Sequence, residues 1–219
     1  MRTAAEVYAA YNVMPSLQLH QLRVAAVGKL IVDNFKEPVS KEDVILACLF
    51  HDMGNIVKSD LSRFPEFCEP EGLSYWEDVK ADFIRRYGSH AHEANIAIGK
   101  ELQLLENVVA IMDASSFSRL ENVLASDSVE LKILQYADTR VGPYGVLSIG
   151  ERLVEARKRY VARIKTKEYY ETDENFEKLS KAAYGIEKQI LALTTIGPDD
   201  INEAAVTPLL EQLRKYPVA

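Results

Sequence analysis

Hydrophobic residues return at helical spacing along most of the chain. Between residues 17 and 35, apolar side chains recur every three or four positions, which is the period of one face of an α-helix. No segment alternates hydrophobic and polar residues over the length of an ordinary strand. The pattern therefore predicts an all-α fold built as a helical bundle. The predicted helices span residues 17–35, 40–52, 75–87, 89–105, 108–115, 128–140, 149–165, 175–193 and 199–215.

The breaks between these helices suggest how the chain is organised. Residues 55–72 carry prolines and several acidic side chains, so we expect a long loop there, with room for a short helix. Pro198 suits a first helical turn, and Pro208 is expected to break or kink the last helix. We predict one domain over residues 1–165 and a C-terminal helical extension over residues 166–219, packed on the same domain.

The charge of the chain bears on its partners. Its 219 residues are enough for a sizeable core, and its formal net charge is −7. That charge argues against nucleic-acid polymers and anionic membranes as partners, but it allows a small anionic substrate held by local cations or a metal. Cys48 and Cys68 show no pairing signal and indicate reduced thiols. With no signal peptide and no apolar run near the roughly 20 residues that span a bilayer, the sequence predicts a cytoplasmic protein.

One apolar run, over residues 45–50, ends in two side chains that can bind metal, His51 and Asp52. Adjacent residues on a helix point about 100° apart, so both can reach one ion only near a helix end, where the backbone turns away. Gly54 is expected to make that turn with a positive φ. The pair predicts half of a metal site. The alternative is a buried histidine hydrogen-bonded to a neighbouring acid.

Two further residues can supply the other half. His20 lies on the apolar face of the helix predicted over residues 17–35 and should point inward. Asp138 ends a mostly apolar run, where an unpaired carboxylate would be costly, and no cation stands four residues away on either side. It is therefore expected to bind metal, with a salt bridge to Arg140 or Arg23, or a position at a helix end facing solvent, as the alternatives.

Together these residues form a mixed donor set of two imidazoles and two carboxylates. That set suits a divalent ion such as Mn, Fe, Co, Ni or Mg better than a closed structural zinc. An ion that prefers six ligands would keep room for water, which becomes a nucleophile at neutral pH when its pKa is lowered. The predicted metal ligands are His20, His51, Asp52 and Asp138.

The order of these ligands resembles that of the HD-domain superfamily of metal-dependent phosphohydrolases, of the type that carries a glycine two residues after the His-Asp pair. The resemblance covers roughly residues 12–165. It implies a bundle of five or more helices, the four residues as metal ligands, and phosphate esters as substrates. The runs that carry it are His20-x-x-Arg23-Val24-Ala25, Leu49-Phe50-His51-Asp52-Met53-Gly54 and Tyr136-Ala137-Asp138.

The chain departs from the specialised branches of that superfamily. Asn55 stands where members often carry Lys or Arg. The Glu-Asp pair of the guanosine-tetraphosphate hydrolases and the Gly-Tyr-Pro motif of the cyclic-di-GMP phosphodiesterases are missing. Met112 and Asp113 stand where two-metal members place a second histidine pair. The departures favour neither specialised activity, and they disfavour a full two-metal site such as that of the di-iron oxygenases on this fold.

Other polar residues are candidates for supporting roles. His90 or His92 could bind a second metal or donate a proton to the leaving oxygen, with an exposed helical turn as the alternative. Four cations are candidates for contacts to a substrate phosphate, with ordinary surface or supporting ion pairs as the alternative. They are Lys58, Arg140, Arg23 and Arg152.

The sequence thus predicts a metal-dependent phosphohydrolase acting on a small phosphate ester, such as a nucleotide. Asp52 and His51 are the predicted catalytic residues, with Asp52 both binding the metal and orienting the attacking water. The expected partner is a small phosphorylated substrate, and a homodimer is conceivable. Two alternatives remain open at this point: a di-iron oxygenase on the same fold, and a non-catalytic module that senses a nucleotide.

Overall fold

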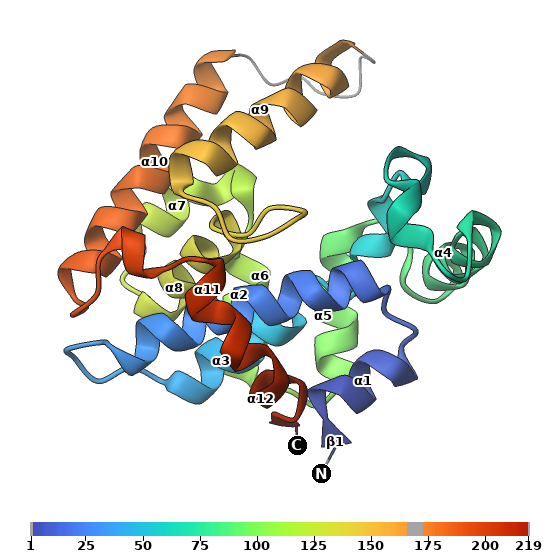
Figure 1. Cartoon of the computed structure of the whole chain (residues 1–219), viewed down its shortest axis with the longest axis horizontal. Coiled ribbons are helices and arrows are strands. Elements are labelled where there is room, and N and C mark those ends of the chain that lie inside the picture. Colours follow the sequence, from blue (N-terminus) through green and yellow to red (C-terminus); the bar gives the residue numbers. More distant parts are fainter. Residues whose placement is uncertain (1, 166–172, 219) are drawn as a thin grey trace.

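The structure, a computed structural model, describes residues 2–165 and 173–218. It is mostly helical, as the hydrophobic pattern predicts, and one short element is not. Strand β1 (Arg2–Thr3) pairs antiparallel with β2 (Pro217–Val218), with Arg2 opposite Val218. This pairing brings the two ends of the described chain together, as Figure 1 shows. Strands this short offer no alternation to detect in the sequence, so the prediction of no strand was wrong at this point.

Three helices form the centre of the molecule: α2 (Pro15–Asp33), α3 (Lys41–Phe50) and α8 (Val129–Thr139). They pack against one another, with the most extensive contact between α2 and α3. Gly28 allows this contact to be close, because a Cβ there would lie 2.9 Å from the sulfur of Cys48. Each of the three helices carries or precedes a candidate metal ligand.

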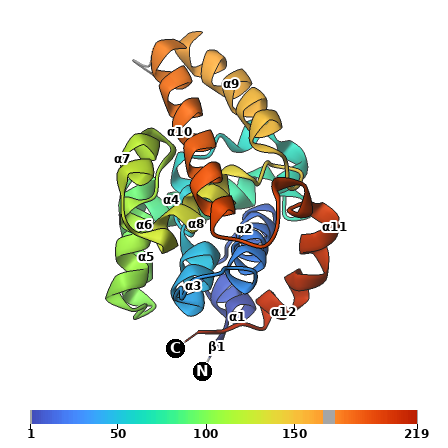
Figure 2. The same cartoon turned by 90° about the vertical axis from the view of Figure 1, so that its left-hand side faces the viewer.

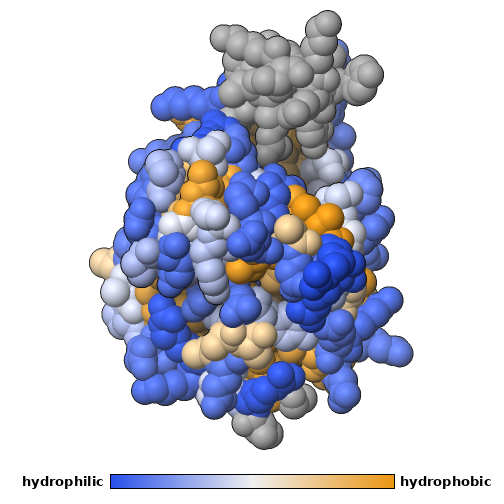
Figure 3. Space-filling model, turned by 90° about the vertical axis from the view of Figure 1, so that its right-hand side faces the viewer, coloured by the Kyte–Doolittle hydropathy of each residue, from blue (hydrophilic) through white to orange (hydrophobic). Residues whose placement is uncertain are grey.

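A second group of helices covers one side of this centre. It contains α4 (Leu73–Tyr87), α5 (Ala91–Glu101), α6 (Glu106–Ala114) and α7 (Leu120–Ala125). The predicted loop over residues 55–72 is a series of short 3₁₀ turns, η1 (Asn55–Lys58), η2 (Leu61–Arg63) and η3 (Pro65–Cys68), on which α4 packs. A further turn, η4 (Phe117–Arg119), leads into α7. Figure 3 views the molecule from the side on which α4 lies in Figure 1 and shows a mainly hydrophilic surface with separate hydrophobic areas.

Two long helices, α9 (Ile149–Lys165) and α10 (Asp173–Ala192), project together from the body (Figures 1 and 2). The base of α10 packs on α7 and α8, and this anchors the pair. The predicted boundary between domain and extension falls at the edge of residues 166–172, which lie outside the described residues. None of the described helices combines the length and the hydrophobicity needed to cross a membrane.

The C-terminal segment differs from the single helix predicted over residues 199–215. It consists of η5 (Pro198–Asp200), α11 (Glu203–Val206), η6 (Thr207–Leu209) and α12 (Leu210–Arg214). Asn202 caps α11 through its side chain, and Pro208 lies in the 3₁₀ turn, as expected of a helix breaker. The segment lies along α2 in both cartoon views (Figure 2). The short helix α1 (Ala4–Ala10), which begins with a Thr3–Glu6 capping box, was not predicted either.

Candidate metal centre

The four predicted metal ligands meet at one point between the central helices. Their ligand atoms all lie within 4.8 Å of one another. His20 Nε2 is 3.2 Å from Asp138 Oδ1 and 3.6 Å from Asp52 Oδ2. His51 Nε2 is 3.5 Å and 3.7 Å from the same two oxygens. Residues 118 positions apart in the sequence are thus brought to a single cluster of two imidazoles and two carboxylates.

The local fold explains how the adjacent pair can converge. Helix α3 ends at Phe50, and His51 is its C-cap in the αR region. Asp52 lies one residue further, in the turn that leads to η1. Its side chain therefore does not have to point about 100° away from that of His51, as it would inside a helix. The Asn55 N–H closes the turn by donating to the Asp52 carbonyl oxygen at 3.0 Å.

The expectation of a positive φ at Gly54 was wrong. Its φ is −94°, which other residues adopt as readily. Glycine is needed there for space, because α5 passes directly against the turn. A Cβ on Gly54 would lie 2.5 Å from the Cβ of Ala94 and 3.1 Å from the backbone nitrogen of Asn95.

Replacing Gly54 by alanine is therefore expected to destabilise the protein by about 1–3 kcal/mol, because a backbone-to-backbone contact cannot relax cheaply. The measurement is urea denaturation of the metal-free protein. Gly99→Ala in α5 is the matched control, since its Cβ would meet its nearest neighbour at 3.4 Å and alanine is the better helix former. A Gly54→Ala protein as stable as the control would contradict this packing argument.

The hydrogen bonding of His51 leaves one ring nitrogen for a cation. Its Nδ1 lies 2.9 Å from the Cys48 carbonyl oxygen and must carry a proton to donate to it. In the neutral imidazole, Nε2 then holds the lone pair. Nε2 is buried and has no hydrogen-bond partner among the residues that the structure describes. A buried, unpartnered nitrogen facing two carboxylates is what a metal ligand looks like without its ion.

The electrostatics of the cluster also favour a bound cation. Burial by itself would lower the pKa of His51, but Asp52 and Asp138 outweigh it and raise that pKa to about 9. Burial works to raise the pKa of Asp138, but the two neighbouring histidines hold it well below its usual range. Both pKa shifts have the same origin, because the negative charge of the two carboxylates favours positive charge next to them. A divalent ion bound between the four side chains would supply that charge.

The donor set and its spacing fit a divalent metal ion. Ligands about 2.1 Å from an ion lie about 3.0–3.4 Å apart in octahedral or tetrahedral sites. The four separations between histidine nitrogens and carboxylate oxygens, 3.2–3.7 Å, approach that range. The side chain of His51 is only 6% exposed, but those of His20, Asp52 and Asp138 are 20–31% exposed. One side of the cluster is therefore open to water or a substrate.

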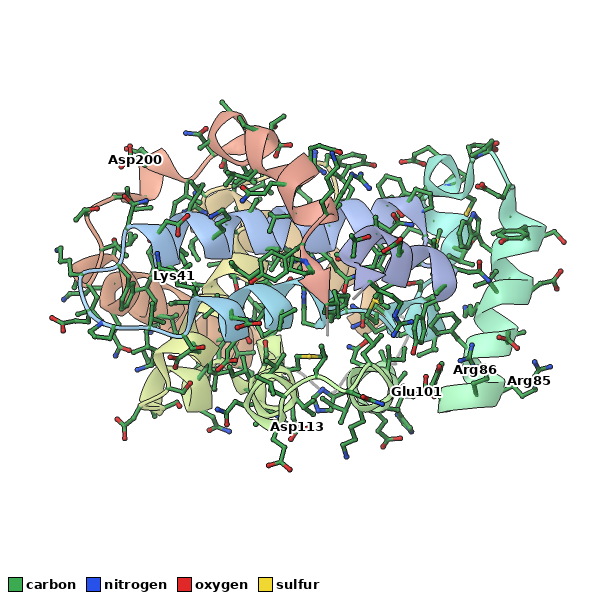
Figure 4. The ribbon with its side chains drawn as sticks, turned by 90° about the horizontal axis from the view of Figure 1, so that it is seen from below. Lys41, Arg85, Arg86, Glu101, Asp113 and Asp200 are labelled. Atoms are coloured by element: carbon green, nitrogen blue, oxygen red, sulfur yellow. The ribbon has the colours of Figure 1, made fainter. Side chains whose placement is uncertain are left out.

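The structure does not bring His90 or His92 into this cluster. His92 Nε2 lies 2.9 Å from Asp113 Oδ1, and both side chains are exposed. Asp113 lies at the outer rim of the molecule in Figure 4. His90 is exposed as the N-cap residue of α5 and makes no side-chain cap. Among the described residues, the metal-competent cluster contains the four ligands named above and neither of these histidines.

Two of the predicted phosphate contacts are engaged in ion pairs. The guanidinium of Arg23 pairs with Glu203 of the C-terminal segment at 2.7 Å. Arg152 donates to the Val141 carbonyl oxygen and pairs with Glu155. Both arginines thus have the supporting contacts that the sequence allowed as their alternative role.

Arg140 also has a different role from the predicted phosphate contact. It is 3% exposed, and its guanidinium donates to the backbone oxygens of Leu147, Pro198 and Ile201 and to the Tyr136 hydroxyl. Because its donors are directed into the protein, Arg140 cannot hold a substrate. The alternative pairing of Asp138 with Arg23 or Arg140 is likewise not observed.

Lys58 differs from the three arginines. It ends η1, six residues after Asp52, and its side chain is exposed. No ion pair of Lys58 is found among the side chains that the structure describes, so its charge is available to a ligand.

Some residues around the site carry no signal in the sequence. Glu203 receives Arg23 on one oxygen and the Val146 N–H on the other, so it ties α2 to the segment after Asp138. Gln21 and Asn95 are buried amides that bond the turn after α3. Their partners lie far away in the sequence, and no pattern of residue types reveals such pairs.

Comparison with known proteins agrees with this geometry. The family model of the HD domain matches residues 18–140, a span that contains all four ligands of the cluster. No curated protein and no solved structure matches the chain. The matched span covers more than half of the 219 residues. With its helical fold and its His/Asp cluster, the chain belongs to the HD-domain family.

Proposed function

We propose that this protein is a metal-dependent phosphohydrolase that acts on a small phosphate ester, with nucleotides as the first class to test. The observation that carries the proposal is the convergence of His20, His51, Asp52 and Asp138 within an HD domain. A divalent ion held there would offset the negative charge that develops on a phosphoryl group and would make water a better nucleophile.

We assign a separate role to His51, Asp52 and Asp138. The hydrogen bond from His51 to the Cys48 carbonyl oxygen fixes the orientation of the imidazole. Asp52 directs Oδ2 toward both histidines, so its other oxygen, Oδ1, would be the one to accept a hydrogen bond from the attacking water and orient it. Asp138 contributes the second carboxylate through Oδ1.

Contacts to the substrate come from the turn after the His-Asp pair. Lys58 can approach a phosphate with its free ammonium group. Asn55 carries a buried Oδ1 with no hydrogen-bond partner among the described residues, and it can accept a hydrogen from a substrate hydroxyl or amine. A protein of net charge −7 needs such local groups to hold an anion.

The test combines metal analysis with a substrate screen. Purified protein is loaded in turn with Mn²⁺, Fe²⁺, Co²⁺, Ni²⁺ or Mg²⁺ and assayed against phosphomonoesters and phosphodiesters, with nucleotides included. We expect about one ion per chain and hydrolysis that Asp52→Ala abolishes. Metal-loaded protein that hydrolyses no member of a broad panel would refute the proposal. Two irons per chain with an optical signature would point to the di-iron oxygenase instead, and ligand binding unchanged by His51→Ala would point to a sensing module.

A further inference from the structure

Two buried carboxamides hold the turn that carries Asp52. Gln21 of α2 is fully buried, and its Oε1 accepts a hydrogen bond from the Asp52 N–H at 3.2 Å. Asn95 of α5 is 6% exposed, and its Oδ1 accepts a hydrogen bond from the Gly54 N–H at 2.5 Å. Side chains from two separate helices thus fix two backbone N–H groups within three residues.

The two hydrogen bonds hold the part of the backbone that carries the candidate ligand Asp52. Gln21 follows His20 directly, so a single turn of α2 carries one ligand and supports the backbone of another. Asn95 follows Ala94, whose side chain and backbone press against Gly54. Packing against Ala94 therefore sets how close the turn lies to α5, and the two hydrogen bonds set the orientation of its Asp52 and Gly54 N–H groups.

Because the two amides are buried, loss of either hydrogen bond is energetically costly. A buried polar group that loses its partner costs about 1–3 kcal/mol, so the turn cannot shift without leaving an amide oxygen or an N–H unpaired. The amide nitrogen of the same Gln21 side chain, Nε2, donates a weak hydrogen bond to the Met53 sulfur at 3.9 Å, and Met53 also belongs to the turn.

We propose that Gln21 and Asn95 are positioning residues for Asp52, acting through the backbone of residues 52–54 to set the geometry of the metal centre. This inference rests on the metal binding of the proposed function. Supporting residues around metal ligands commonly change metal affinity by 10–100-fold when they are replaced. Loss of either carboxamide acceptor is expected to have an effect of that size.

The test uses Co²⁺ alone as the probe, so that it does not depend on a substrate. Gln21→Met and Asn95→Leu remove the acceptor at similar side-chain size, and Asn95→Asp keeps an acceptor oxygen. We expect the first two to bind Co²⁺ about 10–100-fold more weakly, with a changed visible absorption spectrum, and Asn95→Asp to retain most of the affinity. If Asn95→Leu fails to fold, the smaller Asn95→Ala, which has no side-chain acceptor, tests the same loss.

Gln135→Met is the matched control, because Gln135 is also buried and hydrogen-bonded but contacts Ser115 and Thr139 instead of the turn. We expect it to lower the melting temperature of the metal-free protein while leaving Co²⁺ affinity unchanged. Wild-type affinity in Gln21→Met and Asn95→Leu, or equal losses in the control, would overturn the inference while leaving the proposed function intact. A wild-type protein that binds no Co²⁺ and hydrolyses nothing would overturn both.

Discussion

Asp138→Asn is expected to leave a folded protein that retains little metal and lacks the proposed phosphohydrolase activity. Asp138 Oδ1 is the oxygen closest to both imidazoles, at 3.2 Å and 3.5 Å. The amide keeps the size of the side chain but removes the negative charge that the cluster directs at a cation. Replacement of a residue that only supports a ligand costs 10–100-fold, so loss of a ligand should cost on the order of 10³-fold or more. The measurements are metal content per chain and kcat/KM.

Asp33→Asn is the matched control for that experiment. Asp33 lies in the last turn of α2 and pairs with Lys29 and Lys41 at the surface. Ion pairs of this kind contribute about 0–1 kcal/mol, so this variant should keep both metal and activity. Full activity of Asp138→Asn at low metal concentration would show that the cluster is not the catalytic centre.

Arg140→Met is expected to destabilise the protein by about 3–5 kcal/mol, since it breaks a buried polar network. The guanidinium is almost fully buried and donates to backbone oxygens from two separate segments, including Ile201 at 2.6 Å. It also lies 3.9 Å from the Glu187 carboxylate of α10. Methionine fills the space but leaves these acceptors without a donor. Urea denaturation of the metal-free protein measures the loss.

The matched control is Arg85→Met, on the exposed outer face of α4 (Figure 4). Its side chain is 79% exposed, so the change should stay within about 0.5 kcal/mol. Arg140→Lys should not restore stability, because an ammonium group cannot reach the acceptors that a planar guanidinium spans. A loss below about 1 kcal/mol in Arg140→Met would mean that the network carries little energy.

The central helices could be predicted from the sequence because each has an extended buried face, and α3 and α8 also have a capping residue at their start. Ser40 and Ser128 accept hydrogen bonds from the N–H groups of Asp43 and Leu131, as capping residues do. The four ligands could be predicted because their residue types are costly in apolar surroundings and because their order resembles a known family. Hydrophobic faces, capping residues and polar residues in apolar runs can be recognised in the sequence without knowledge of the tertiary structure.

The rest depended on contacts between distant parts of the chain. The reason for Gly54 is its contact with α5, some 40 residues away, and a sequence pattern offers only the conformational explanation. Arg140 looked like a free cation near the site, but its partners come from residues 147, 198 and 201. The sequence predicts a break or kink of the last helix at Pro208, but the hydrophobic period gives no sign of the earlier interruption at Asn202, which caps α11.

The contacts of the C-terminal segment affect which fragments of the protein keep their buried interactions. The family match ends at residue 140, yet Arg23 pairs with Glu203, and Arg140 donates to the backbone oxygens of Pro198 and Ile201 as well as to nearer groups. A fragment cut at the family limits would expose a buried guanidinium and release an ion pair one turn from His20. The region that holds the His/Asp cluster therefore depends on the C-terminal segment for contacts that a fragment ending at residue 140 would lack.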